Sequence, residues 1–270
     1  MKYLILAFSF MVTVSCSENL YDEFADKDTP EAIFFDAKIA LNDRDYAGAI
    51  ALLQSLDPTF LAARERVPVH ASAFSGRCGL EFLTLLQNLE NAGSGTVFVT
   101  LMSAFPGALA ANVQDCIDAE TIMDGIGDAT VRNGDENLFM AFISFAKIGT
   151  ILSSLADTDD NGTADAGFDQ CDNTDFPDAT VRELGASLAV AITSLTALTT
   201  SYVDDTITEV NNLCALDANL NNYCTLTDPA AFSASEIQAL RYLIGSNDAG
   251  IDSCGGNDFT NCAIANPVCP

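Results

Sequence analysis

The sequence predicts an all-α fold: a bundle of helical hairpins, repeat-like in places, with long acidic loops and disulfide staples. Apolar residues recur at helical spacing along most of the chain, whereas strand-like alternation is scarce. Aspartate outnumbers glutamate 27 to 11. Because aspartate prefers caps and loops to helix interiors, we expect the charge to lie mostly in the connections. The nine cysteines indicate folding in an oxidising compartment. The helical domain is expected at residues 30–245.

Helix signals can be followed in order along the chain. Thr29, Pro30 and Glu31 combine a capping hydroxyl, a first-turn proline and an acid, which is typical of a helix start. Ser233 and Glu236 have the spacing of a capping box. The expected helices are 32–42, 45–56, 72–91, 96–105, 109–122, 133–156, 178–213 and 233–244.

The first two helices are expected to form a hairpin over residues 30–58. Small residues, Ala37 and Ala49, fall where two antiparallel helices would cross, Tyr46 lies near the turn, and Pro58 follows the second helix. This pattern resembles a tetratricopeptide repeat. The resemblance implies a helical hairpin and a face that binds a protein or peptide, but a solenoid needs several copies and no second good copy follows.

Two later helices are related in sequence. Residues 128–132 and 178–182 are both Asp-Ala-Thr-Val-Arg, and similar residues continue at the same offset. This predicts stacked helical units, with chance likeness between two buried helices as the alternative. Residues 184–203 carry no charge, but their Ser and Thr side chains make them too polar for a membrane span. We therefore predict that both segments are core helices.

The N-terminus has the features of an export signal. A basic start is followed by an apolar run of about eleven residues, which is too short to span a bilayer. Residues 1–15 are therefore interpreted as a signal peptide. Ser15 precedes Cys16, which resembles the lipobox of bacterial lipoproteins, with Thr13 in place of the usual leucine. The resemblance implies lipidation at Cys16. The alternative is an ordinary signal peptide, which would leave an odd cysteine in the secreted chain.

The segment after the lipidation site predicts the cellular location of the protein and how it is attached to the membrane. Residues 16–29 are interpreted as a lipid anchor and an acidic tether. Ser17 follows the cysteine, where aspartate would imply retention at the inner membrane, so the resemblance implies an exported protein of the outer membrane. The formal net charge of −27 repels nucleic acid and anionic lipid. Nucleic acid is therefore excluded, and membrane contact is expected through the lipid alone.

The strongest local motif lies in the acidic loop at residues 157–172. Its first part matches the first half of an EF-hand calcium loop, in which alternating acids wrap the ion and Gly162 permits the sharp turn. Phe168 stands where that family has a bidentate glutamate, and Asp169 follows it. The predicted calcium ligands are Asp157, Asp159, Asn161, Thr163 through its carbonyl, Asp165 and Asp169.

The calcium is expected to be structural, since the loop joins the two related helices. The loop also resembles the calcium repeats of thrombospondin type 3, because a cysteine and further aspartates follow. That resemblance implies a second site formed by Asp172, Asp175 and Asp178. The alternative is a solvated acidic loop that binds no ion.

The remaining cysteines are even in number and are expected to form four disulfides. Eight cysteines allow 105 pairings, so the sequence does not choose among them. Three of the eight lie in a Cys-rich tail at residues 246–270, which has too little apolar content to order itself. The predicted disulfide cysteines are Cys78, Cys116, Cys171, Cys214, Cys224, Cys254, Cys262 and Cys269.

These observations favour a non-enzymatic exported lipoprotein, a calcium-stabilised helical scaffold for protein–protein interaction at the cell envelope. His70 is the single histidine and no nucleophile or phosphate-binding motif accompanies it, so an enzyme is not expected. The alternatives are a small-ligand carrier associated with a solute transporter and a hydrolase. An apolar cavity between helices would favour the carrier, whereas a cleft with convergent acids of perturbed pKa would favour the hydrolase.

Overall fold

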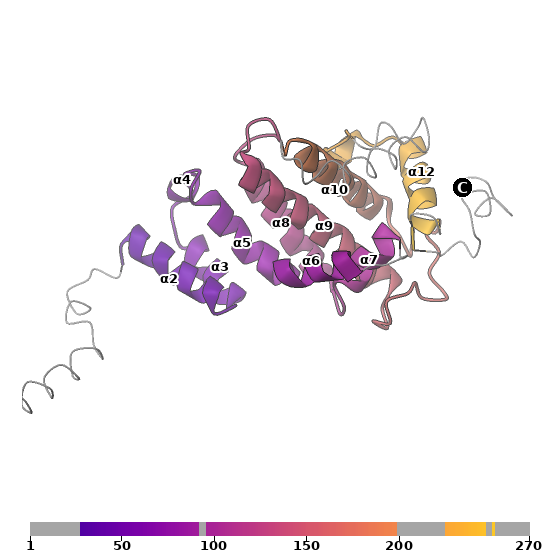
Figure 1. Ribbon diagram of the computed structural model, residues 1–270, viewed down its shortest axis with the longest axis horizontal. Coiled ribbons are helices and arrows are strands. Elements are labelled where there is room, and N and C mark those ends of the chain that lie inside the picture. Colours follow the sequence, from indigo (N-terminus) through magenta and orange to yellow (C-terminus); the bar gives the residue numbers. More distant parts are fainter. Residues whose placement is uncertain (1–27, 92–95, 199–224, 247–249, 252–270) are drawn as a thin grey trace, which may run out of the picture.

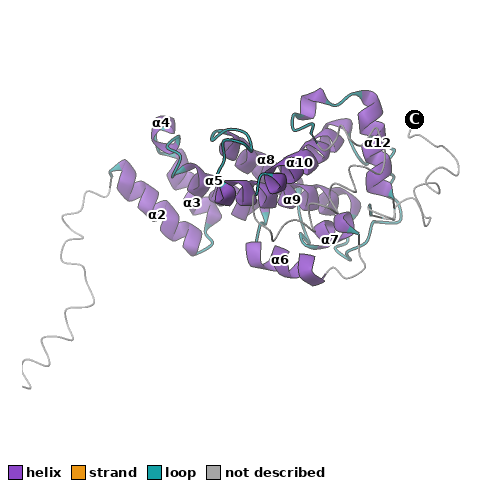
Figure 2. Ribbon diagram, turned by 45° about the horizontal axis from the view of Figure 1, so that its top comes forward, coloured by secondary structure: helices purple, strands orange, loops and turns teal. Residues whose placement is uncertain are grey.

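The computed structural model describes residues 28–91, 96–198, 225–246 and 250–251. Within these ranges the regular structure is helical throughout and contains no β-strand (Figure 2), which confirms the all-α prediction. The helices are α2 Pro30–Asn42, α3 Tyr46–Gln54, α4 Pro58–Leu61, α5 Val67–Cys78, α6 Phe82–Asn91, α7 Val97–Ser103, α8 Ala110–Asp124, α9 Gly134–Ala156, α10 Asp178–Thr196 and α12 Ala234–Gly245, with a 3₁₀ turn at Pro229–Ala231.

The helices form an elongated bundle (Figure 1). α2, α3 and α4 lie at one end, α12 lies at the other, and α8, α9 and α10 occupy the middle. α9 and α10 pack along one another and run antiparallel: Lys147 of α9 pairs with Glu183 of α10, and Gly134 at the start of α9 faces Leu198 just beyond the end of α10. α5 packs on α8, and α7 packs on α9.

The predicted helix starts are confirmed where a cap was recognised. The Thr29 hydroxyl accepts a hydrogen bond from the backbone N–H of Ala32 at 3.2 Å. Ser233 and Glu236 form the expected capping box. These caps satisfy amide groups that the first turn of a helix leaves without partners.

One predicted helix, 72–91, is wrong, because the chain forms two helices there. α5 begins earlier, with Pro68 in its first turn, and ends at Cys78, with Gly79 as its C-cap. Gly79 has φ +107°, a left-handed conformation that glycine adopts without strain and that commonly ends helices. The short helix α4 was not predicted. α10 ends at Thr196, and the rest of the predicted 178–213 helix lies outside the described residues from 199 on.

The predicted N-terminal hairpin is present as α2 and α3. Ala37 and Ala49 are fully buried where the helices meet. The ring of Tyr46 packs directly on Gly76 of α5, where an added Cβ would lie 2.1 Å from the Tyr46 Cε1 atom. The hairpin thus contacts the rest of the bundle through the Tyr46 ring, which packs against the backbone of Gly76.

The middle of the bundle is a buried helical core, as predicted for both related helices. α9 is the one helix, among the described residues, that is long and apolar enough to cross a membrane, and 72% of its most apolar window is buried inside the protein. A disulfide between Cys78 and Cys116, with Cα atoms 5.2 Å apart, links α5 to α8 beside this core.

The two identical pentapeptides adopt different structures. Residues 178–182 form the first turns of α10, whereas residues 128–132 form a turn before α9. In that turn the Asp128 carboxylate accepts hydrogen bonds from the amide and hydroxyl of Thr130, and Ala129 accepts one from the Asn137 side chain. The sequence similarity therefore does not extend to local structure over these five residues.

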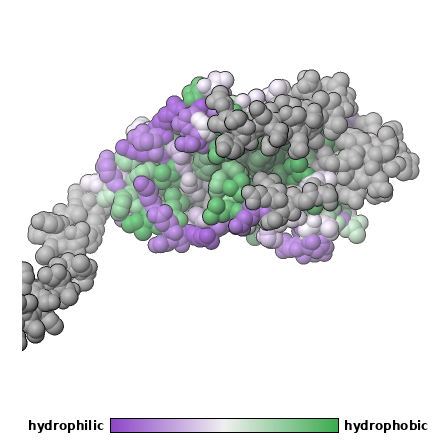
Figure 3. All heavy atoms as spheres, viewed as in Figure 1, coloured by the Kyte–Doolittle hydropathy of each residue, from purple (hydrophilic) through white to green (hydrophobic). Residues whose placement is uncertain are grey.

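Apolar side chains also reach the surface. In the view of Figure 3, hydrophobic residues gather over the N-terminal helices and around the middle of the bundle, with hydrophilic residues between them. The large exposed apolar residues include Phe35 and Ile39 on α2 and Phe82 and Leu83 on α6. The described surface thus offers apolar contact area at two places.

Candidate functional site

The acidic loop follows directly from the end of α9 and leads into α10. Asp157 caps the last turn of α9 and is 2% exposed, whereas Asp159 is exposed and Asp165 lies between these extremes. One carboxylate oxygen from each of these residues lies within 4.8 Å of the other two. The loop therefore brings together three of the predicted calcium ligands.

Backbone hydrogen bonds to Asp157 give the loop its shape. One carboxylate oxygen of Asp157 accepts from the N–H of Asn161 and the other from the N–H of Gly162, both at 2.9 Å. Gly162 has φ +79° and Asp160 has φ +58°, so the chain turns sharply twice within three residues. This is the turn for which the sequence pattern requires a glycine.

The next predicted ligands lie on the same turn. The side-chain nitrogen of Asn161 donates to Asp159 at 2.9 Å, and its side-chain oxygen accepts from the N–H of Thr163 at 2.9 Å. Asp165 accepts from the N–H of Thr158 at 3.1 Å. These contacts hold oxygen-bearing side chains along one short stretch of chain.

Asp169 is not part of the three-carboxylate group. Its carboxylate accepts a hydrogen bond from the N–H of Cys171 at 2.8 Å, and its N–H donates to Asp175 at 3.1 Å. The neighbouring Phe168 packs on Phe176, with ring centroids 5.9 Å apart. Coordination by Asp169 therefore stays a prediction that would require its side chain to turn toward the cluster.

The electrostatics of the loop differ from residue to residue. Burial raises the pKa of Asp157, and the nearby carboxylates of Asp159 and Asp160 raise it further against the effect of its backbone hydrogen bonds. Hydrogen bonds from Thr158 lower the pKa of Asp165. A buried carboxylate next to two others is a group that a bound cation would stabilise in its charged form.

The loop also touches the turn between α7 and α8. The N–H of Gly107 donates to the Asp160 carboxylate, and the Ser103 hydroxyl donates to the carbonyl of Gly162 at 3.3 Å. The cluster of Asp157, Asp159 and Asp165 is therefore held against the bundle from a second side.

The end of the loop receives one positive charge from the protein itself. Arg241 of α12, with 4% of its side chain exposed, donates to the carbonyl of Gln170, to Asn173 at 3.3 Å and to Asp178 at 2.8 Å. Its guanidinium also lies 5.7 Å from the centre of the Phe176 ring. Of the three acids suggested for a second calcium site, Asp178 is thus already paired with an arginine.

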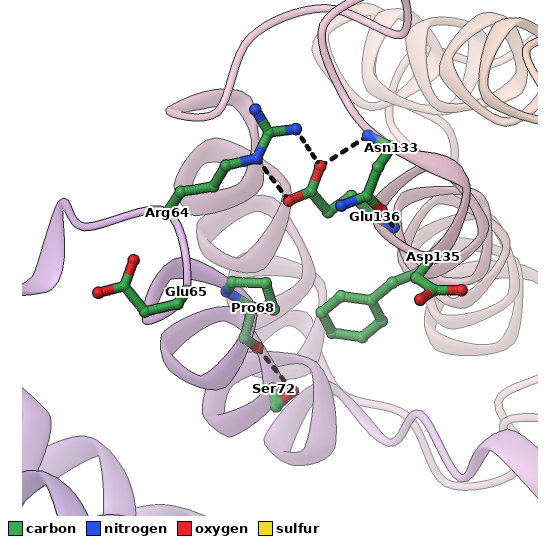
Figure 4. A pocket seen from close by; sticks show the side chains of 8 residues that line it. Arg64, Glu65, Pro68, Ser72, Asn133, Asp135 and Glu136 are labelled. Atoms are coloured by element: carbon green, nitrogen blue, oxygen red, sulfur yellow. Dashed lines mark hydrogen bonds and ion pairs between the residues drawn. The ribbon is translucent and has the colours of Figure 1, made fainter.

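An open cleft of about 580 Å³ lies between the turn after α4 and the start of α9 (Figure 4). Arg64 pairs with Glu136 through two hydrogen bonds of 2.9 and 2.6 Å, and it also donates to the carbonyl of Val131. This contact lowers the pKa of Glu136. The cleft is lined by Arg64, Glu65, Pro68, Ser72, Asn133, Asp135, Glu136 and Phe139.

A second, more apolar cleft of about 420 Å³ contains His70 on its wall. Burial lowers the pKa of His70, so its imidazole is neutral at pH 7. His70 packs edge-on against Phe74 at 5.6 Å between ring centroids. The structure thus gives His70 a packing contact, and the sequence contains no second histidine.

Sequence reasoning missed a buried ionic cluster in the core. Lys147 of α9, with 3% of its side chain exposed, pairs with Glu120 of α8 and Glu183 of α10. Burial opposes its charge, but attraction to the two glutamates outweighs burial and raises the pKa of Lys147. Ser144 donates to Glu120 at 2.8 Å. Each of the three helices thus supplies a charge to one buried cluster where they meet.

The predicted disulfide and lipidation residues are only partly described. Cys78 pairs with Cys116, and Cys171 is also disulfide-bonded. Cys16 and the other predicted disulfide cysteines lie outside the described residues: Cys214, Cys224, Cys254, Cys262 and Cys269.

Comparison with known proteins adds no relative. No family model matches the chain, no curated protein is significantly similar in sequence, and no solved structure is significantly similar in fold.

Proposed function

We propose that this protein is an exported, lipid-anchored helical scaffold that binds a protein partner at the cell envelope and is stabilised by a calcium ion in its acidic loop. The observation that carries the calcium proposal is the meeting of Asp157, Asp159 and Asp165 within 4.8 Å around a glycine turn. Calcium prefers several oxygen ligands from carboxylates and carbonyls, which this turn offers.

A structural role for the ion follows from the position of the loop. The loop connects the two central helices α9 and α10 and rests on the turn that leads into α8. An ion that draws its carboxylates together would therefore stabilise the packing of three helices. Extracellular calcium modules achieve this with dissociation constants of about 10⁻⁴–10⁻³ M.

The scaffold proposal is supported by apolar side chains at the described surface. Large apolar side chains are exposed on α2 and α6, where they are available to a partner. The export and lipidation proposals are supported by the N-terminal sequence and by the Cys78–Cys116 disulfide, which requires oxidising conditions.

Thermal unfolding tests the calcium proposal directly. At about 5 mM free calcium, mass action with the affinities above gives about 1–2 kcal/mol of stabilisation. For a domain of this size, that raises the melting temperature by about 2–8 °C. Removing calcium should reverse the gain, and magnesium should not replace it. An identical melting temperature with and without calcium would contradict the calcium proposal.

Crosslinking of the lipidated protein in envelope fractions tests the scaffold proposal. Recovery of one reproducible protein partner is expected. A small-ligand carrier is the second candidate, favoured by the apolar walls that Leu56, Leu61 and Val67 give to the second cleft. Co-purification of a lipophilic ligand without a protein partner would reverse the order of the two.

A further inference from the structure

The dipeptide Asn-Gly occurs twice in the chain, at Asn133–Gly134 and at Asn161–Gly162. An asparagine before glycine is prone to lose its side-chain amide, because glycine has no Cβ to shield its backbone nitrogen. Both asparagines are exposed, so water reaches both side chains. The two pairs differ in what holds the glycine nitrogen, and this difference predicts which pair is protected in the folded protein.

The deamidation reaction needs only the chain and water. The backbone nitrogen of the glycine gives up its proton and attacks the side-chain carbon Cγ of the asparagine. A C–N bond forms, the bond from Cγ to the amide nitrogen breaks, and ammonia leaves with the proton. Water then opens the resulting cyclic imide at either of its carbonyls. One opening gives aspartate, and the other gives isoaspartate, in which the main chain runs through the former side chain.

At Asn161 the acidic loop holds both reacting groups. The N–H of Gly162 donates to a carboxylate oxygen of Asp157 at 2.9 Å. The side-chain nitrogen of Asn161 donates to Asp159 at 2.9 Å, and its oxygen accepts from the N–H of Thr163 at 2.9 Å. The attacking nitrogen would have to lose its proton beside a negative charge, which disfavours that step. The side-chain amide would also have to leave both of its partners, so the closed loop shields this pair.

At Asn133 the reaction does not depend on the acidic loop. Gly134 is exposed and begins α9, and the first amides of a helix have no partner within the helix. The Asn133 side-chain oxygen accepts from the N–H of Glu136 at 3.0 Å. This pair lies at the opposite end of α9 from the loop, so it serves as a reference site within the same molecule.

We propose that Asn161–Gly162 is a latent deamidation site, which the closed loop protects and which loss of calcium opens to reaction. The inference rests on the proposed calcium site and names a way in which that site is regulated. Without the ion, the three carboxylates that lie within 4.8 Å repel one another and favour opening. Conversion removes the amide that donates to Asp159, and isoaspartate also adds a carbon to the main chain of the turn. A chain that has lost calcium is thereby marked permanently, because the ammonia has left.

Mass action sets the size of the effect. When conversion takes place only in the open loop, a ligand of the closed loop slows it by the factor 1 + [L]/Kd. At about 5 mM free calcium, dissociation constants of about 10⁻⁴–10⁻³ M give a factor of about 6–50. We therefore expect Asn161 to convert more slowly by this factor with calcium than with a chelator, and Asn133 to convert at the same rate in both.

Peptide mass mapping of the full chain, incubated at mildly alkaline pH with calcium or with a chelator, tests the proposal. After reduction, trypsin cuts after Arg132, Lys147 and Arg182, which places the two asparagines in separate peptides. Replacement of the amide by a hydroxyl shifts the peptide mass, and fragment ions assign the shift to one residue. Calcium that raises the melting temperature but leaves the rate at Asn161 unchanged would overturn the proposal.

Two variants test the contact that shields the nitrogen. Asp157→Ala frees the N–H of Gly162, so Asn161 should convert faster than in the unsubstituted chain, and calcium should no longer slow it. Asp172→Ala is the matched control, because Asp172 is exposed, lies in the same loop and is not one of the three clustered carboxylates. It should keep the calcium effect. Thermal unfolding confirms that each variant is folded, and the calcium comparison on the unsubstituted chain depends on neither.

The chain unfolded in urea separates failure of this inference from failure of the calcium proposal. Its rate at Asn161 is the rate without protection. An equal rate in the folded, calcium-loaded protein would overturn the inference, whatever calcium does to the melting temperature. A melting temperature that does not respond to calcium would contradict the calcium proposal, while shielding by Asp157 would still be measured as a folded rate below the unfolded one.

Discussion

The acidic loop has two halves, residues 157–165 and residues 169–178. Both gather aspartates whose negative charges repel one another, but the two halves differ in how a positive charge reaches them. In the second half, the buried guanidinium of Arg241 reaches from α12 to Gln170, Asn173 and Asp178 and supplies the positive charge. In the first half, the described chain supplies no cation to Asp157 and Asp159, and they meet only backbone amides and the Asn161 side chain. The comparison teaches that a cation of the protein reaches the second half, whereas the first half is suited to a bound ion.

The largest expected effect comes from removing the cation of the second half. Arg241→Ala removes the guanidinium from the carbonyl of Gln170 and from Asp178, whose side chain is 58% exposed, so we expect a loss of about 1–3 kcal/mol in the free energy of unfolding. Urea denaturation measures it, and the loss should be the same with and without calcium.

The control for this change is Arg44→Gln. Arg44 pairs with Glu81 at the surface, with 70% and 41% of the two side chains exposed. Exposed pairs contribute about 0–1 kcal/mol. If Arg241→Ala cost no more than this control, the second half of the loop would not depend on the arginine.

The sequence predicted the turn in the first half of the loop but not the arginine contact in the second half, and the reason is physical. The first half is a local motif in which Asp157, Gly162 and Asp165 lie within nine residues, so spacing alone indicates the turn. Arg241 is 63 residues from Asp178 along the chain. Their contact depends on how α12 packs on α10, and no local pattern records that packing.

The same distinction applies to the fold. Caps such as Thr29 and Ser233 are local and were found. Gly79 was also a local signal, because a glycine that ends a helix often precedes a break, and the predicted single helix overlooked it. The Lys147 cluster joins three helices and could not be predicted from the sequence. Along the chain, Lys147 is only an isolated charge in an apolar segment, and its partners lie on two other helices.

The second prediction separates the halves through their response to calcium. Asp159→Ala removes one of the three clustered carboxylates, so the melting temperature should lose its calcium-dependent rise of about 2–8 °C. Asp172→Ala is the matched control, because Asp172 is exposed, lies in the same loop and is not one of the three clustered carboxylates. The control should keep the full rise. Equal responses in the two variants would mean that calcium acts outside the cluster.

The third prediction concerns the turn itself. Gly162→Ala forces a side chain into φ +79° and places its Cβ 3.1 Å from the Ser103 hydroxyl, so we expect a loss of about 1–2 kcal/mol and weaker calcium binding. Gly167→Ala is the control, since its Cβ would meet nothing within 4 Å. Calorimetry with and without calcium measures both. A Gly162 variant as stable as the Gly167 variant would contradict the turn requirement.

The smallest expected effect is on the pH dependence of the calcium response. Because burial raises the pKa of Asp157, its protonated form stabilises the metal-free fold at low pH, and this contribution is lost as the pH rises through the raised pKa. Calcium binds the carboxylate, so protons compete with it. The calcium-dependent rise in melting temperature should therefore fade as the pH falls toward the pKa of Asp157, above the ordinary value of about 3.9.

The pH comparison isolates the first half of the loop from the rest of the protein. Glu136 has a lowered pKa because of Arg64, so it loses its stabilising contribution as the pH falls, but it does so with or without calcium. Subtracting the melting temperature without calcium from the one with calcium cancels the contribution of Glu136. The difference that remains reports on the acidic loop. Asp159→Ala should show a difference near zero at every pH. A calcium response that stays constant down to about pH 4, near the ordinary carboxyl pKa, would show that Asp157 does not hold the ion.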